Sequence, residues 1–310
     1  METALITSCS NRKSISKKHR ASSAQLVKGS LLQTAKSWKK LTKAHSPKIN
    51  ASELYQGRGF LEAKHAATKL NADHWIISAG LGLIKSDQKI PAYDLTVSGT
   101  GTASIKNKVL SNDFTSQAWW KEINKKGRNL ADLIQKNQNK LFIIAVPNSY
   151  FHMISADLEA LSVKDLKRVR IIGPTKKAIP EHYAELYLPY DTRLDGPKSP
   201  IKGTRSDFPQ RSAHHFSEYI YPKAKSGTAS KHALLVSEAM KRMKYPSTPE
   251  RAKKTDQEIL TLIKKNWKKC SGQTGKLLRI MRDEELIACE QGRFKDLVNG
   301  YRDNMARKKK

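Results

Sequence analysis

The chain has 310 residues, of which 58 are Lys or Arg and 28 are Asp or Glu, so its net charge is +30. This length supports a sizeable core in one large domain or two smaller ones, and no stretch approaches the 18 consecutive apolar residues of a transmembrane helix. The amino terminus lacks the pattern of a secretory signal. Three cysteines without a C-x-x-C pair argue against a disulfide scaffold, so we expect a cytoplasmic protein.

The positive charge extends along the whole chain. Residues 212–310 hold 23 Lys and Arg against 11 Asp and Glu, and the remaining residues hold 35 against 17. Solubility requires far less charge, so the excess indicates a polyanionic partner, most simply double-stranded DNA. The alternative is a lysine-rich surface that only keeps the protein soluble. A membrane surface is disfavoured because no basic amphipathic helix carries bulky aromatic anchors, and no obligate protein partner is evident.

Five short apolar runs predict buried strands, because their length and β-branched content favour strand over helix. They lie at residues 4–7, 74–78, 141–146, 170–172 and 185–188. Residues 52–70 and 117–138 carry the apolar spacing of helices. Strands that alternate with helices predict an α/β sandwich with a mainly parallel sheet. In such a sheet, ligands bind at the carboxyl ends of the strands.

The last third of the chain looks helical. We expect residues 191–212 to form an ordered loop anchored by Arg205 and Phe208, and residues 223–230 to form a linker between domains at 1–222 and 231–310. Thr255 and Glu258 have the spacing of a capping box. Helices at 256–269, 274–285 and 290–302 resemble a helix-turn-helix unit that contacts DNA through a basic middle helix. The alternative is a helical bundle that packs on the main domain.

Small polar residues follow the first predicted strand as Ser8, Cys9, Ser10 and Asn11. Small side chains let backbone N–H groups approach a phosphate or base closely, and the Asn11 amide suits a base edge or an attacking water. An ordinary capped turn explains the same residues equally well. For Cys9 a passive role is favoured over a nucleophilic one, because no His has local spacing that marks it as a base.

Two carboxylates compete for a catalytic role at the same predicted edge. Asp94 could orient water or stabilise an oxocarbenium-like sugar, with Tyr93 stacking on a base, although an Asx turn is the simpler reading. Asp191 is the other candidate. After the third strand, Asn148, Ser149 and Tyr150 could pair with and stack on a nucleobase, or form a plain turn.

Other recognised site patterns are weak. Arg205, Arg211, His214 and His215 could hold phosphates, although both histidines could equally be surface residues. The nine histidines form no metal-ligand spacing and no Walker loop is present, so we expect neither a metal nor another cofactor.

Three segments carry a resemblance to known proteins: LITSCSNRK at 5–13, ASELYQGRGF at 51–60 and WIISAGLGLIKSDQKIPAYDLTV at 75–97. They resemble prokaryotic and phage proteins related to the peroxide-stress family and to the accessory domain of archaeosine synthases. Those proteins share an S-C-S-x-x-K opening, an L-Y motif and an S-A-x-x-G-L…P-x-Y-D block. The resemblance is strong over residues 4–97 and weak to about 215.

The resemblance implies a fold similar to uracil-DNA glycosylases, a three-layer sandwich with a four-stranded, mainly parallel sheet. It also implies a DNA glycosylase that flips a modified base from phage DNA, for example glucosylated hydroxymethylcytosine, and leaves an abasic site in anti-phage defence. The alternatives are a non-catalytic DNA-binding stress protein and an RNA- or nucleoside-modifying enzyme. The G-Q-D-P-Y and H-P-S-P motifs of ordinary uracil glycosylases are absent, which leaves individual roles open.

The predicted site residues fall into three groups. Catalysis is assigned to Asp94, Asn11 and Asp191. The base pocket is assigned to Ser8, Cys9, Ser10, Tyr93, Asn148, Ser149 and Tyr150, and the resemblance adds Ser78 and Gly80. DNA contacts are assigned to Arg12, Lys13, Lys176, Lys177, Arg205, Arg211, Lys276, Arg279 and Arg282.

Overall fold

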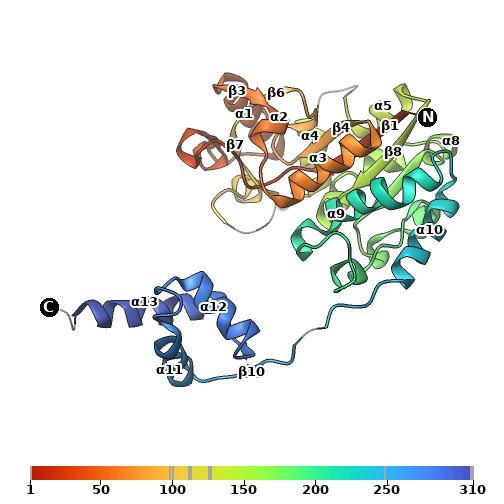
Figure 1. Cartoon of the computed structure of the whole chain (residues 1–310). Helices are drawn as coiled ribbons and strands as arrows, with labels where there is room; N and C mark the ends of the chain where they lie inside the picture. Colours follow the sequence, from red (N-terminus) through yellow and green to blue (C-terminus); the bar gives the residue numbers. More distant parts are fainter. Residues whose placement is uncertain are drawn as a thin grey trace. The chain divides into compact units, whose positions relative to one another are not determined.

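The computed structural model describes residues 2–97, 99, 101–110, 114–124, 128–247 and 249–307. The chain forms two compact units, Met1–Pro246 and Ser247–Lys310. In the first, a central sheet has the strand order β5-β4-β1-β8-β9 (Figure 1). Strands β1 (Glu2–Ser8), β4 (Ala72–Ser78), β8 (Lys140–Ala145) and β9 (Val169–Ile172) are parallel, whereas β5 (Gly82–Lys85) is antiparallel to β4. The mixed α/β fold with a mainly parallel sheet is confirmed, with five strands instead of four.

The strand predictions were wrong at two places. Residues 185–188 do not form a strand: Glu181–Leu186 is a 3₁₀ helix, and only Tyr187 bridges Ile171 of β9. Strand β5 was missed because residues 79–84 were assigned to a loop. Gly82 has a φ of 76°, a value that glycine adopts readily, and this permits the tight turn from β4 into an antiparallel edge strand.

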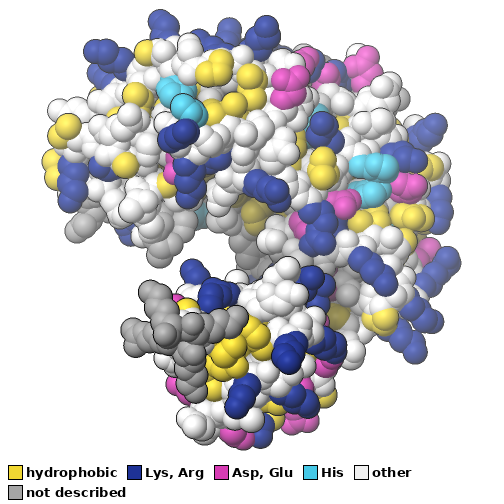
Figure 2. All heavy atoms as spheres, turned by 60° about the vertical axis from the view of Figure 1, so that its left-hand side comes forward, with side chains coloured by type: hydrophobic (Ala, Val, Ile, Leu, Met, Phe, Trp, Pro, Cys, Tyr) yellow, Lys and Arg dark blue, Asp and Glu magenta, His cyan; other side chains and the backbone are white. Residues whose placement is uncertain are grey.

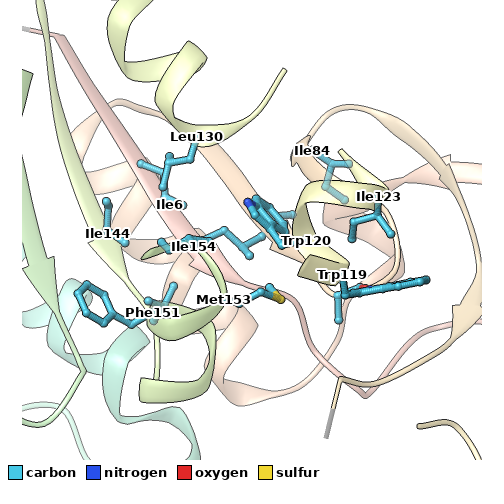
Figure 3. Close-up of a cluster of buried hydrophobic side chains, with 14 of the residues drawn as sticks. Ile6, Ile84, Trp119, Trp120, Ile123, Leu130, Ile144, Phe151, Met153 and Ile154 are labelled. Carbon is cyan, nitrogen blue, oxygen red and sulfur yellow. The ribbon is translucent and has the colours of Figure 1, made fainter. Parts of the chain in front are cut away.

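Helices cover both faces of the sheet, because alternate residues of its buried strands point to opposite sides. Leu5 and Ile143 join one apolar cluster with α3 (Arg58–Leu70), α9 (Phe208–His215) and α10 (Ala229–Lys241). Ile6 and Ile144 join the other cluster (Figure 3). Its helices are α1 (Leu31–Ala44), α4 (Ser116–Ile123), α5 (Leu130–Lys136), α6 (Asn148–Met153) and α7 (Ser155–Glu159).

Both long helices predicted in this unit are interrupted. The first divides into α2 (Ala51–Leu54) and α3, and between them Gly57 has a φ of 100°. The second divides into α4 and α5, and residues 125–127 lie outside the described part of the chain. The smaller elements are β2 (Ala21–Ser22) paired with β7 (Tyr93–Asp94), β3 (Lys48–Asn50) paired with β6 (Lys89–Pro91), and α8 (Val163–Leu166).

The predicted linker and domain boundary were wrong. Within residues 223–230, the Gly227 carbonyl accepts a hydrogen bond from buried Arg170, whose Nε also donates to the ring of His232 in α10. Val236 and Met240 of α10 lie in the core of the first unit. The boundary therefore falls after Pro246.

The second unit is a small helical domain, as the sequence predicted. It contains β10 (Ala252–Lys253), α11 (Asp256–Asn266), α12 (Thr274–Asp283), β11 (Ile287–Ala288) and α13 (Gln291–Arg307). The capping box of Thr255 and Glu258 opens α11, and apolar residues from all three helices form a separate core. None of the described helices of either unit is long and apolar enough to span a membrane.

Candidate functional site

A cavity of about 810 Å³ lies at the carboxyl ends of β1 and β8. This is the edge at which parallel α/β sheets bind ligands, and the volume is typical of small-molecule sites. Most of the residues that line it have polar side chains. The lining comes from the loops after both strands, the start of α3, the segment before α9, and neighbouring residues: Ser8, Cys9, Ser10, Asn11, Gln56, Gly57, Arg58, Gly59, Phe60, Thr96, Val97, Ser116, Pro147, Ser149, Tyr150, His152, Thr204, Ser206, Asp207 and Gln210.

The predicted first loop forms one side of this cavity. The Cys9 amide continues the β1–β4 pairing by donating to the Ile77 carbonyl at 3.0 Å. Ser10 Oγ donates to the Gln56 carbonyl at 2.7 Å and accepts from the Arg12 amide at 3.1 Å. These bonds hold the loop against the turn that precedes α3, so the exposed Asn11 amide projects from a fixed backbone.

Below the loop, the predicted base-stacking Tyr93 is fully buried and does not line the cavity. Its hydroxyl lies 2.9 Å from that of Tyr55 and 2.7 Å from Ser78 Oγ. Tyr55 and Ser78 are also hydrogen-bonded to each other, so the three buried hydroxyls form a closed triangle. Burial raises the pKa of Tyr93 well above its ordinary value, so the phenol stays neutral. Tyr93 and Ser78 are therefore buried outside the lining of the cavity, contrary to prediction.

Gly80 allows the Tyr93 and Trp38 rings to pack closely against the turn after β4. A Cβ at this position would lie 2.7 Å from the ring of Tyr93 and 3.3 Å from that of Trp38. The Gly80 carbonyl accepts from Trp38 Nε1 at 2.6 Å. The absence of a side chain thus lets two aromatic rings pack against this turn.

Lys13 was predicted to contact DNA, but its side chain is buried. Its Nζ donates to the Ser10 carbonyl at 3.2 Å and lies 4.4 Å from the centre of the Tyr93 ring. Burial lowers the pKa of Lys13, while Cys9 and Asp94 oppose that shift. Cys9 itself lines the cavity, with Sγ 3.2 Å from the Tyr150 hydroxyl.

On the α9 side, Asp207 is a carboxylate of the cavity wall that is held by two arginines. Arg58 Nε lies 2.6 Å from Oδ2, and Arg211 Nε lies 2.7 Å from Oδ1. Burial raises the pKa of Asp207, but the hydrogen bonds from Arg211 and Arg58 outweigh burial and lower it overall. An acid paired in this way is unsuited to accept a proton.

Arg211 is fully buried and ties the segment before α9 together, so the prediction that it contacts DNA was wrong. Its guanidinium also pairs with Asp195 and donates to the carbonyls of Leu194, Ile201 and Thr204. The predicted anchor Arg205 is exposed, and Phe208 begins helix α9 instead of sitting in a loop. Arg211, and not Arg205, therefore anchors the segment before α9.

Gln210 supplies the strongest indication that the cavity takes a ligand. The residue is only 7% exposed, its Nε2 donates to Ser8 Oγ at 3.1 Å, and its Oε1 has no hydrogen-bond partner among the residues that the structure describes. A buried acceptor without a partner is rare and costly, and an incoming donor would satisfy it. Gln210 was not predicted, because residues 191–212 were interpreted as a loop.

The two candidate acids are not brought together in the cavity. Asp94 pairs in β7 with Ser22 of β2, and it is absent from the lining. Asp191 caps a 3₁₀ helix (Thr192–Asp195) and accepts from the guanidinium of Arg193, with one N–O distance of 2.6 Å. Asn148 is likewise outside the lining, because its side chain bonds to Thr175. Of the predicted catalytic residues, Asn11 lines the cavity.

Several exposed cations are carried by segments that form this edge. Arg12 and Arg58 flank the turn at Gly57. Arg205 directly follows Thr204, which lines the cavity. Lys176 and Lys177 come directly after Thr175, which is hydrogen-bonded to Asn148. Lys and Arg side chains are also distributed over the face visible in Figure 2. Across the chain, residues 1–246 hold 41 Lys and Arg against 19 Asp and Glu.

In the second unit, Lys276 and Arg279 are exposed on α12, as a DNA-contacting helix requires. Arg282 is half-buried, and its guanidinium donates to the Cys289 carbonyl at 3.1 Å. That bond gives Arg282 a structural partner within the domain. Residues 247–310 hold 17 Lys and Arg against 9 Asp and Glu.

Two further groups of residues were not found from the sequence. His152 lines the cavity and is bonded to Gln117 at 3.2 Å, two positions after Tyr150. His65, His214 and Glu218 place ligand atoms within 4.8 Å of one another, although no spacing in the sequence indicated a metal site.

His215, a predicted phosphate ligand, is buried and bonded to the Tyr190 hydroxyl at 2.9 Å, so that prediction was wrong.

The fold and the cavity define an α/β protein with a cavity at the carboxyl edge of a mainly parallel sheet. Residues 39–171 match the model of DUF6884, a family of unknown function. The matched region contributes His152, Tyr150 and the start of α3 to the cavity, whereas Asn11 and Gln210 lie outside it. No curated protein and no solved structure matches the chain.

Proposed function

We propose that the protein is a DNA glycosylase that accepts a modified, everted base in the cavity at the carboxyl edge of the sheet. The observation that carries the proposal is a cavity of about 810 Å³ lined by both Asn11, which is exposed, and Gln210, whose side-chain oxygen has no hydrogen-bond partner among the described residues. The cavity exceeds the needs of a bare base, which favours a base with a bulky polar substituent. Glucosylated hydroxymethylcytosine in phage DNA, as the sequence resemblance suggests, has this chemistry.

The wall of the cavity offers hydrogen bonds of the kind that read a base edge. Gln210 offers an acceptor, Ser149 is an exposed hydroxyl after β8, and the Asn11 amide can both donate and accept. Phe60 adds an apolar surface within the same lining. A flipped base needs both polar contacts at its edge and apolar contacts at its face.

The proposed cleavage needs a positioned water and a stabilised leaving group. Asn11 orients a water whose oxygen attacks C1′ of the deoxyribose, and the electrons of the N-glycosidic bond leave with the base. His152 donates a proton to the departing base, and the attacking water releases its proton to solvent. The products are an abasic sugar with a C1′ hydroxyl and a neutral free base.

The cations around the cavity would hold the DNA. Exposed Arg12, Lys176, Lys177 and Arg205 lie on segments that form the cavity edge or adjoin it, and Lys276 and Arg279 lie on α12 of the second unit. Contacts of this kind bind phosphates without reading sequence, and they make affinity fall steeply with salt.

A second candidate function is DNA binding without cleavage. It is favoured by the position of the acids, because neither Asp94 nor Asp191 lines the cavity and Asp207 is paired with two arginines. A non-catalytic protein would use the same cavity to recognise a flipped base and then hold it. Release of the base is the property that separates the two functions.

The experiment measures base release from DNA duplexes that contain cytosine, hydroxymethylcytosine, glucosylated hydroxymethylcytosine or uracil. Mass spectrometry identifies any free base, and alkali cleavage counts the abasic sites. We expect release from the glucosylated duplex and a loss of about 100-fold in rate for Asn11→Ala, because losing the group that positions a reactant costs about that much. Asn107→Ala, at an exposed position of the 3₁₀ helix Ile105–Lys108 outside the lining, is the matched control.

Asp94→Asn separates the two assignments of the catalytic group. If Asn11→Ala abolishes release while Asp94→Asn keeps it, catalysis lies in the cavity; the reverse result would return the role to Asp94. Fluorescence anisotropy with each duplex reports binding independently. Salt-sensitive binding by the wild type without release from any duplex would reject the glycosylase and leave the non-catalytic function.

A further inference from the structure

Helices α3 and α9 pack closely along their length, and they bring a group of imidazoles and carboxylates together at the surface. His65 lies on α3 and His214 lies on α9. Glu218 follows on a π-helix, Phe216–Ile220, that continues α9. Short π-helical segments interrupt α-helices frequently at functional sites. The two histidines are 149 positions apart in the sequence, so spacing could not reveal the cluster.

The distances between the facing atoms match a metal coordination shell. Glu218 Oε2 lies 3.4 Å from His65 Nε2 and 3.2 Å from His214 Nε2. A tetrahedral ion with ligands at about 2.0–2.1 Å has ligand–ligand separations of about 3.3 Å. The three atoms all lie within 4.8 Å of one another, so a small closure of the two imidazoles completes the shell.

The surroundings orient the ligand atoms as a metal site requires. Glu62 Oε2 lies 2.5 Å from His214 Nδ1, which leaves Nε2 of that ring facing Glu218. A carboxylate on the remote nitrogen of a histidine ligand is the usual outer partner in zinc sites, because it fixes the tautomer and the ring orientation. Lys69 contacts Oε1 of Glu218 at 3.5 Å, and Oε2 remains on the imidazole side.

We propose that His65, His214 and Glu218 bind a zinc ion, with a water in the fourth position. Two imidazole nitrogens and one carboxylate suit Zn²⁺, whereas Mg²⁺ and Ca²⁺ prefer oxygen ligands throughout. The ion would link α3 to α9. Gln210 lies one helical turn before His214, so the same link would fix the amide that projects into the cavity wall.

The competing account is a hydrogen-bonded cluster that binds no ion. In that case His214 would carry a proton on both nitrogens, each facing one carboxylate, and added metal would have no effect on the protein. The proposal does not depend on the glycosylase function, because binding is measured without DNA.

The experiment titrates the full-length protein, stripped with a chelator, with Zn²⁺ by calorimetry and with Co²⁺ by absorption. We expect one site that takes Co²⁺ with the visible bands of four-coordinate nitrogen and oxygen ligation, and without the near-ultraviolet thiolate band that a cysteine site would show. Zn²⁺ should raise the thermal midpoint of the first unit. The side chain of His65 is 48% exposed, so His65→Gln is expected to fold normally.

Three variants test the assignment. His65→Gln and Glu218→Gln should each remove the Co²⁺ bands and the thermal shift, and Glu62→Gln should weaken binding about 10–100-fold. His182→Gln, an exposed histidine elsewhere in the same unit, is the matched control and should bind as the wild type does. Absence of Co²⁺ bands in the wild type, or their persistence in folded His65→Gln protein, would overturn the proposal.

Discussion

Replacing Arg211 tests how the α9 side of the cavity is held together. Arg211→Met removes a fully buried cation and leaves the carboxylate of Asp207, whose side chain is 7% exposed, with Arg58 as its remaining cation. Three carbonyls lose a donor as well. Breaking a buried ion pair in this way costs about 3–5 kcal/mol, so we expect the free energy of unfolding of the first unit to fall by that amount.

Arg58→Met is the matched control, because Arg58 pairs with the same carboxylate from the surface. Its side chain is 49% exposed, and pairs of that kind contribute about 0–1 kcal/mol. Urea unfolding followed by tryptophan fluorescence suits the comparison, since Trp38, Trp75, Trp119 and Trp120 lie in the first unit. Equal losses for the two variants, or a loss below about 1 kcal/mol for Arg211→Met, would refute the proposed role of Arg211.

Three other predictions concern stability. Gly80→Ala should lower the free energy of unfolding of the first unit by about 1–3 kcal/mol, because the new Cβ would lie 2.7 Å from the Tyr93 ring. Gly300→Ala in α13 meets open space and should stabilise the second unit by about 0.5–1 kcal/mol. Urea unfolding of each unit checks both predictions. Burial lowers the pKa of His74 from 6.5 to about 4, so the neutral ring favours folding above pH 6.5 and that stability is lost as the pH falls towards 4. The free energy of unfolding should fall by about 3 kcal/mol through this group between pH 7 and pH 4. In His74→Gln, the decrease over the same pH range should be smaller by about that amount, as urea unfolding at each pH measures.

The sequence predicted most of the buried framework of the first unit. Strands β1, β4, β8 and β9 are apolar runs buried on both faces, and such runs are recognisable without tertiary information. The failures came where tertiary contacts decide the conformation. Strand β5 forms because a glycine turn folds it back on β4. The run at residues 185–188 spans the end of a 3₁₀ helix and a single bridge from Tyr187 to β9, so its apolar residues are buried without forming a strand.

The candidate site was predicted in part, for a related reason. The loop of Ser8 and Asn11 follows a recognisable strand, so its place at the cavity was foreseeable from the order of elements. Gln210 and Asp207 reach the same cavity from a segment about 200 residues later in the chain. Their contribution depends on the packing of α9 against α3, which no local pattern encodes. Tyr93 was misplaced because it was assigned to the loops after β4, whereas it lies in the short strand β7, which pairs with β2, and its side chain is buried.

The polar atoms without partners restrict the ligand further. Among the residues that the structure describes, five buried side-chain atoms lack a hydrogen-bond partner, and two of these are amide oxygens at or beside the cavity, on Gln210 and Gln117. Buried Arg211 and Arg170, in contrast, each make several hydrogen bonds. Unmet acceptors next to a cavity call for a ligand that donates. Cytosine offers an exocyclic amino group where thymine offers a carbonyl, and an attached sugar adds hydroxyl donors. Under the proposed function we therefore expect tighter binding of a modified cytosine than of a thymine, and competition binding with the two bases in otherwise identical duplexes measures this preference.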